Sequence, residues 1–230
     1  MAAQLESTFE VITHIHQLAE HEKALLAQEL HDELGVCLIS AVLDLALLAP
    51  RITSSSGDSQ QKFRRVQESL SSAIAITRRI TEQLRPTLLD NVGLFAALRW
   101  QLRNVCERSK IKCKDDLPAT ELQLTSRASI TLFRSTQEAL IVGLERPGVT
   151  EIELVGKMED AALHIHVRGD GCNLLDAPQP LCHVTLNSIR HRVRVLGGVV
   201  NVDHPPNGGI VVGVSTPIAN VVSPARDRGW

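Results

Sequence analysis

The sequence predicts an α+β protein in which a long helical hairpin is followed by an α/β sandwich. Three observations predict this class. Apolar residues recur three and four positions apart through the first half of the chain, which is typical of amphipathic helices. Strand patterns follow after about Arg103, and the segment from Ala162 to Val167 alternates apolar and polar side chains. The length of 230 residues is enough for two small domains or one large one.

The first helix is expected from about Leu5 to Leu48. Ala49-Pro50 should end it, because proline disfavours helix at the preceding residue. A loop is expected over 54–59, which is rich in serine and contains a glycine. The apolar positions of this helix form one stripe, made of Leu26, Leu30, Leu34, Cys37, Ala41, Leu45 and Leu48.

A second long helix follows and should end near Arg85-Pro86. Its apolar positions alternate three and four apart, which favours an antiparallel pair or a four-helix bundle. A single hairpin of this kind would leave apolar surface in water, so we expect a homodimer that forms a four-helix bundle. The seam comprises Phe63, Val66, Leu70, Ala73, Thr77, Ile80 and Leu84.

The second half has the pattern of a sandwich with helices on one face of a mixed sheet. Helices are expected over 126–144 and 186–196, the latter ended by Gly197-Gly198. Strands are expected over 111–114, 150–155, 162–167, 199–202 and 209–216. We therefore expect a helical domain over 1–103, a sandwich domain over 104–219 and a disordered tail over 220–230.

The composition argues against several functional classes. Hydrophobic residues make up 43% and charged residues 22% of the chain, which is ordinary for a soluble protein, and a net charge of −2 gives no general attraction to nucleic acid. No uninterrupted apolar run reaches ~18 residues and the N-terminus lacks a signal-peptide pattern, so we expect no membrane segment and a cytoplasmic location. Since no sensor segment precedes the first helix, we expect any input signal to come from another protein.

Metal and disulfide chemistry are not expected either. His14 and His21 could share a helix face, but no acidic or cysteine ligand completes a set. The five cysteines show no Cys-x-x-Cys pair and no metal-ligand spacing, so we expect mostly buried thiols in a reducing compartment. They stand at positions 37, 106, 113, 172 and 182.

His31 is the candidate reactive residue. It lies beside the apolar stripe of the first helix, with Ala27 one turn before it and Gly35 one turn after it. Glycine inside a helix costs on the order of 1 kcal/mol relative to alanine, so a benefit should offset it. We expect that benefit to be clearance around the imidazole for a docking partner, at Ala27, Gly35 and Leu38. A histidine on a solvated helix flank fits these residues equally well.

The segment around His31 decides between these interpretations. Residues 22–35, EKALLAQELHDELG, resemble the phosphoacceptor box of two-component histidine kinases of the nitrate-sensor type. Residues 84–94, LRPTLLDNVGL, resemble the end of that family's dimerisation hairpin. Gln137-Glu138-Ala139-Leu140 and Leu196-Gly197-Gly198 are weaker matches to its ATP-binding domain and occur in the right order. The resemblance extends from about Leu5 to Pro217.

The resemblance implies roles for particular residues. His31 would be the phosphoacceptor, and Asp32 would be the general base that also orients the imidazole. The partners would be receiver domains of response regulators, and a hybrid histidine kinase is a further candidate. The receiver would supply its own Mg²⁺. The family's phosphatase glutamine falls at Val36, whose apolar side chain cannot orient a water, so we expect little phosphatase activity.

The nucleotide-binding motifs of the family are altered in this sequence. The asparagine that helps to hold the nucleotide's Mg²⁺ falls at Val142, and the aspartate that recognises adenine falls at Gly169. The family also has glycines that let backbone amides approach the phosphates closely, and in this sequence those glycine positions carry side chains. The altered glycine positions are Asn173, His183, Thr185 and Ser188. We therefore expect no nucleotide cofactor.

These observations predict a histidine-containing phosphotransfer protein. His31 would take a phosphoryl group from one receiver aspartate and pass it to another, without autophosphorylation by ATP. Two alternatives stay open: a pseudokinase that binds and inhibits a response regulator or kinase, and an active kinase with an atypical nucleotide site.

Overall fold

The computed structural model describes residues 2–52, 57–171, 180–206 and 208–223. The chain divides into two compact units. One is the helical unit, residues 14–87, and the other comprises residues 88–230 together with 1–13. The boundary expected at residue 103 is wrong in position, because it falls inside helix α5 (Leu94–Ser109), whose apolar face packs into the core of the second unit.

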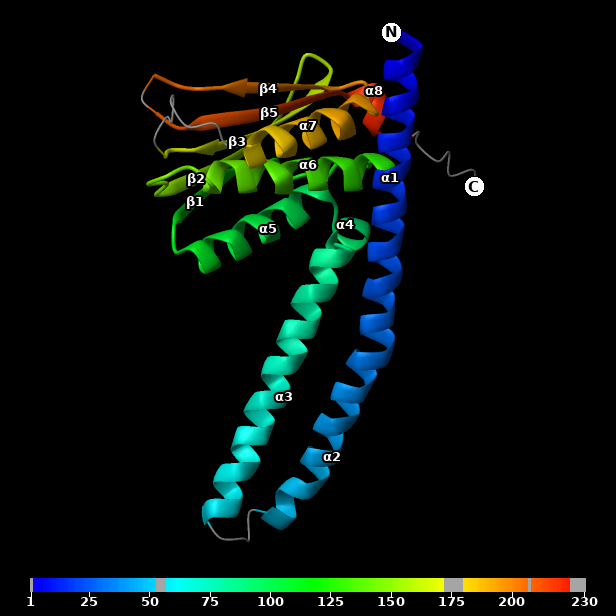
Figure 1. The fold of residues 1–230 in the computed structure, drawn as a ribbon. Coiled ribbons are helices and arrows are strands. Elements are labelled where there is room, and N and C mark those ends of the chain that lie inside the picture. The colour runs from blue at the N-terminus through cyan, green and yellow to red at the C-terminus, as the bar shows by residue number, and fades with distance from the viewer. Residues whose placement is uncertain (1, 53–56, 172–179, 207, 224–230) are drawn as a thin grey trace. The chain divides into compact units, whose positions relative to one another are not determined.

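The helical unit is a hairpin, as predicted (Figure 1). Helix α1 (Ala2–Glu29) continues through a π-helical turn, η1 (Leu30–Gly35), into α2 (Val36–Ile52), and α3 (Gly57–Leu84) runs back along α2 and η1. Two helix ends, the last turn of α2 and the first turn of α3, differ from the sequence expectation. Pro50 lies inside the last turn of α2, where proline removes one backbone hydrogen bond and the helix ends two residues later. Residues 57–59, expected in a loop, form the first turn of α3.

The apolar stripes of the hairpin are only partly covered within one chain. Leu38, Leu45 and Leu70 are half-buried, whereas Val66 and Ile80 of the predicted seam are 46% and 39% exposed. Further large apolar side chains of α2 and α3 lie in water, including Val36, Ile39, Leu43, Leu47 and Ile76. Exposed apolar surface of this extent on two adjacent helices marks an association face.

One described helix is long and apolar enough to cross a membrane. It runs over Val11–Pro50 and contains an 18-residue window with a mean hydropathy of 1.9, none of it buried. This finding differs from the sequence expectation, because an averaged window accepts the isolated polar residues that interrupt a run. The apolar face of a helix that associates with other helices meets the same criterion of length and composition.

The second unit is a mixed sheet with helices on one face (Figure 1). Its order is β1-β2-β3-β5-β4, with β1 parallel to β2 and the other pairs antiparallel. Helices α5, α6 and α7 pack against this sheet, and the short helix α4 (Thr87–Asn91) precedes α5. The further elements are β1 (Lys112–Asp116), α6 (Ser126–Leu144), β2 (Glu151–Glu159), β3 (Ala162–Gly169), α7 (Pro180–Arg194), β4 (Val199–Asp203), β5 (Ile210–Pro217) and α8 (Ile218–Val221).

The core of this unit follows from strand alternation. Every second residue of β2, β3 and β5 faces the helices, and these positions are almost completely buried except for Met158 near the end of β2. Phe95 and Leu98 of α5 and Phe133 of α6 fill the space above them. The Glu121 carboxylate accepts hydrogen bonds from the backbone N–H groups of Phe95 and Ala96 at 2.9 and 2.6 Å, which caps the first turn of α5.

Two further expectations need correction. Cys106 and Cys113 form a disulfide, because α5 and β1 bring their Cα atoms to 6.1 Å, so they are not the thiols expected. Cys37 is free and exposed, while Cys172 and the Cys182 side chain lie outside the described residues. The disorder expected from residue 220 is wrong for residues 220–223, because Ser223 donates from its backbone N–H to the Gln123 carbonyl at 2.7 Å. Residues 224–230 lie outside the described residues.

Candidate functional site

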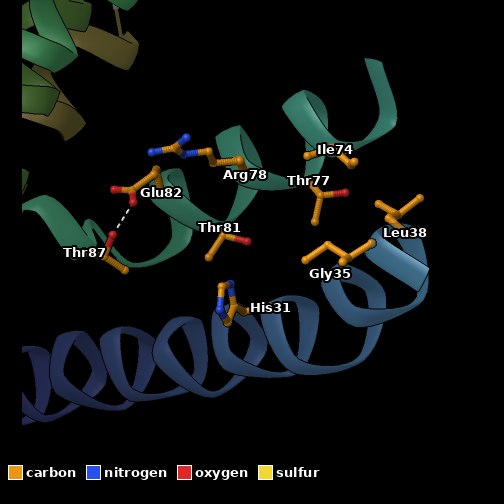
Figure 2. A pocket seen from close by; sticks show the side chains of 10 residues that line it. His31, Gly35, Leu38, Ile74, Thr77, Arg78, Thr81, Glu82 and Thr87 are labelled. Atoms are coloured by element: carbon orange, nitrogen blue, oxygen red, sulfur yellow. Dashed lines mark hydrogen bonds between the residues drawn. The ribbon is translucent and has the colours of Figure 1, made fainter. Parts of the chain in front are cut away.

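His31 lines a cavity inside the helical hairpin. The cavity has a volume of about 360 Å³ and is enclosed by one face of η1 and α2 and the facing side of α3. Figure 2 shows the imidazole pointing from η1 toward Thr81 on α3. The His31 side chain is itself exposed, and it makes no hydrogen bond or ion pair among the described residues. An accessible imidazole with both nitrogens unengaged is suited to nucleophilic attack.

The backbone around His31 is a π-helix, which the sequence did not predict. All six residues of η1, from Leu30 to Gly35, adopt it, and the Val36 N–H bonds to the Glu33 carbonyl where the α-helix resumes. Such turns are rare and occur frequently at functional sites. Gly35 ends the turn, and a Cβ added there would meet nothing closer than the Leu30 carbonyl oxygen at 3.9 Å. Gly35 therefore leaves open space beside His31.

The predicted docking residues do not all lie where the sequence suggested. Gly35 and Leu38 line the cavity with His31, so this helix face turns toward α3. Ala27, one turn before His31, is 2% exposed. Ala27 therefore offers almost no surface to a partner, and the docking role of Gly35 and Leu38 stays a prediction. Asp32 is exposed and is not among the cavity residues, and within the described chain no hydrogen bond joins it to His31.

The opposite wall of the cavity carries polar groups that sequence reasoning missed. Thr81 is 8% exposed, and its hydroxyl has no hydrogen-bond partner within the described chain. Glu82 accepts a hydrogen bond from the Thr87 hydroxyl through Oε1, while its buried Oε2 has no partner there. The only signal in the sequence was the position of these residues at the end of the α3 seam, opposite His31 in an antiparallel hairpin.

Two of the positions that correspond to the nucleotide motifs, Val142 and Gly169, are closely packed. Val142 is 1% exposed, and its side chain belongs to the apolar core. A Cβ at Gly169 would lie 2.7 Å from the Gly143 carbonyl oxygen, so these two backbones are in direct contact. Thr185 and Ser188 are half-buried on α7. Asn173 and the His183 side chain lie outside the described residues.

Asp170 follows Gly169, but its carboxylate is engaged in holding the start of β2. It accepts hydrogen bonds from the Thr150 N–H and hydroxyl, at 2.8 and 2.6 Å, and from the Glu151 N–H at 2.9 Å. Burial is the largest single influence and raises the pKa of this carboxyl, but the hydrogen bonds from Thr150 and Glu151 together outweigh it and hold the pKa below its usual value. Asp170 therefore has a structural role in this conformation.

The described residues hold no group of three or more His, Cys, Asp or Glu side chains placed to bind a metal ion. His164 and His166 stack on β3 with ring centroids 6.3 Å apart, and His164 Nδ1 lies 2.8 Å from the Ser215 hydroxyl.

Comparison with known proteins identifies the hairpin. Residues 22–89, which include His31 and the facing cavity wall, match the family model HisKA_3, described as histidine kinase. This segment is therefore similar in sequence to the HisKA_3 family. The matched segment is followed by the sheet unit, in the order that the sequence predicted.

Curated relatives agree with the family. The chain is 26% identical over 204 residues to the nitrate/nitrite sensor protein NarQ of Escherichia coli, covering 88% of this chain and 36% of that protein. It is 34% identical over 120 residues to the sensor histidine kinase MctS of Rhizobium johnstonii, covering 52% of this chain and 26% of that protein. This chain therefore spans about a third of these relatives' length or less.

A solved structure supports the fold. The blue-light activated histidine kinase of Erythrobacter litoralis EL346 matches 72% of this chain and 64% of its own, with a TM-score of 0.50 and 16% identity. These comparisons show that the chain is similar to histidine kinases, by the family model over residues 22–89 and by the relatives over longer segments.

Proposed function

We propose that this protein is a histidine-containing phosphotransfer protein of a two-component phosphorelay. His31 takes a phosphoryl group from the aspartyl phosphate of one receiver domain and returns it to the aspartate of another. The proposal depends on the contrast between the His31 cavity and the positions of the nucleotide motifs. His31 is exposed at an open cavity in a HisKA_3 hairpin, whereas Val142 and Gly169 are packed into the core.

The packed residues do not fit ATP and its Mg²⁺. Val142 has no oxygen to offer a cation, and its side chain lies in the apolar core. Gly169 has no carboxylate for adenine, and its contact with the Gly143 backbone leaves no room for one. The proposal therefore routes no step through ATP, and the cation that neutralises charge during transfer is the receiver's own Mg²⁺.

The exposed apolar face of α2 and α3 supports a homodimer. Two hairpins in a four-helix bundle would cover Leu43, Leu47 and Val66, which lie in water in a single chain. The proposed role also requires the hairpin to lie in the cytoplasm with the receiver domains. A hybrid histidine kinase that carries a receiver domain would be one source of the phosphoryl group. Val36 is 57% exposed and apolar beside this site, so it supports transfer without hydrolysis.

A second candidate function is an active histidine kinase. The names of two relatives favour it, because MctS is called a sensor histidine kinase and UhpB of Salmonella typhimurium a histidine-protein kinase/phosphatase. A third candidate, a pseudokinase that only binds a response regulator or kinase, would use the same hairpin surface without chemistry at His31.

One experiment separates the three candidates. The wild-type chain and His31→Gln are each mixed with a receiver carrying ³²P on its aspartate, and separately with ³²P-ATP and Mg²⁺. Phosphotransfer predicts label from the receiver on the wild type alone and none from ATP. Label from ATP on the wild type would establish the kinase. Receiver binding by both proteins with no label on either would establish the pseudokinase.

A further inference from the structure

The α3 wall of the His31 cavity contains two buried polar atoms that have no hydrogen-bond partner within the described part of the chain. They are the Thr81 hydroxyl and Glu82 Oε2, and they belong to successive residues. A buried polar atom without a hydrogen bond costs free energy, on the order of 1 to 3 kcal/mol, unless a ligand or a moving side chain satisfies it. Both residues line the cavity that His31 also lines, so the imidazole is a nearby group able to do so.

The Glu82 carboxylate is held through one of its two oxygens. The Thr87 hydroxyl donates to Oε1, and Figure 2 shows this bond along the cavity wall. One oxygen is thereby fixed, and Oε2 is left as a pure hydrogen-bond acceptor. Asp32, the acid next to His31 in the sequence, is exposed and does not line the cavity.

We propose that Glu82 is the positioning carboxylate of His31, with Oε2 accepting a hydrogen bond from one ring N–H of the imidazole. This inference rests on His31 being the phosphoacceptor. A carboxylate in this position selects the tautomer, because the nitrogen that donates to it keeps its proton and the other nitrogen keeps its lone pair. Carboxylates orient catalytic histidines in the same way in other enzymes.

The step balances with this arrangement. The free ring nitrogen attacks the phosphorus of the receiver's aspartyl phosphate, so that an N–P bond forms and the P–O bond to the aspartate breaks. The aspartate leaves as a carboxylate. The other ring nitrogen retains its proton, and the ring becomes positively charged. The Glu82 carboxylate stabilises that charge where it develops.

The test uses Glu82→Gln, which keeps the shape of the side chain and removes its charge, in the full chain. Glu68→Gln is the matched control, since Glu68 lies on the same helix, exposed and outside the cavity. ¹⁵N NMR measures the His31 tautomer ratio. Phosphoramidate, a small phosphoryl donor, measures the rate of labelling, with His31→Gln giving the background from other histidines.

We expect Glu82→Gln to shift the tautomer ratio toward the mixture of free histidine and to slow labelling about tenfold or more. Glu68→Gln should change neither. Glu82→Asp, which restores a carboxylate, should recover the tautomer preference at least in part, whereas a merely structural defect would not respond to charge.

An unchanged tautomer ratio in Glu82→Gln, or an equal shift in Glu68→Gln, would overturn the proposal, as would a shift seen only in Asp32→Asn. These measurements involve no receiver. Failure of phosphoryl transfer from a receiver would therefore contradict the proposed function and leave the Glu82 result intact. A negative Glu82 result would likewise leave the proposed function intact.

Discussion

Restoring the family's aspartate at position 169 tests whether packing closes the nucleotide site. Gly169 ends β3, and a Cβ there would lie 2.7 Å from the oxygen and 3.2 Å from the carbonyl carbon of Gly143 on α6. Backbone atoms cannot rotate away as a side chain can. Gly209 adds to the crowding, because its own Cβ position lies 2.2 Å from the Gly169 carbonyl oxygen. Gly169→Asp must therefore push α6 away from the sheet.

The cost follows from this overlap. Overpacking a core usually costs about 1 to 3 kcal/mol, and the upper half of that range applies where the neighbour is backbone. A loss of about 2 kcal/mol lowers the melting temperature of a domain of this size by roughly 8 °C. Gly57→Asp is the matched control, because a Cβ at Gly57 meets nothing within 4 Å. Gly57 lies in the first turn of α3, where an acidic residue is favourable.

The assay is thermal unfolding by circular dichroism, combined with calorimetric titration of ATP and Mg²⁺. We expect a lower melting temperature for Gly169→Asp, no change or a small increase for Gly57→Asp, and no ATP binding by either variant. A Gly169→Asp variant that melts like the wild type and binds ATP would refute the reasoning, because the site would then need only its aspartate.

Four further predictions each concern one residue or one bond. Leu43→Glu, at a side chain 60% exposed in one chain, should convert a dimer to a monomer in detergent-free sedimentation, and a wild-type monomer would contradict the bundle. Burial, followed by the positive charge of His164, holds the pKa of His166 below its usual value. Because the unfolded chain binds this proton more readily than the folded chain, the free energy of unfolding measured in urea should fall as the pH drops below about 6.5. The fall should be smaller in His166→Gln. Glu121→Ala removes the cap on α5 and should lower the unfolding free energy by about 1 kcal/mol. Reducing agent should lower the melting temperature of the wild type but not of Cys106→Ser, and equal responses would argue against the disulfide.

The hairpin and the sandwich were predictable because periodicity records which side chains meet the core. The alternation over 162–167 predicted a half-buried strand. The structure confirms it, because these residues lie in β3 and Leu163, Ile165 and Val167 are buried. Helix α5 was missed because no change of pattern separates it from the hairpin, so the expected domain boundary fell within it. Its position depends on contacts with residues far along the chain, which local pattern does not record.

The site was predictable only in part. His31 and its glycine could be found from a local motif, and both line the cavity. The π-helical turn was not predictable, because its sequence has an ordinary α-helical pattern. Thr81 and Glu82 became candidates only once α3 was paired with η1, since 50 or more residues separate them from His31 in the sequence. Asp32 is the opposite case, because it is next to His31 in the sequence but does not line the cavity.

The most direct test of the account is passage of label through His31 between two receivers. A ³²P-labelled receiver and a second, larger receiver are mixed with the wild-type chain or with His31→Gln, without ATP, and the label is followed by gel electrophoresis over time. The account predicts label appearing first on the wild-type chain and then on the second receiver, and on neither with His31→Gln. Label that reaches the second receiver equally well with His31→Gln, or that never leaves the first receiver with the wild type, would contradict it.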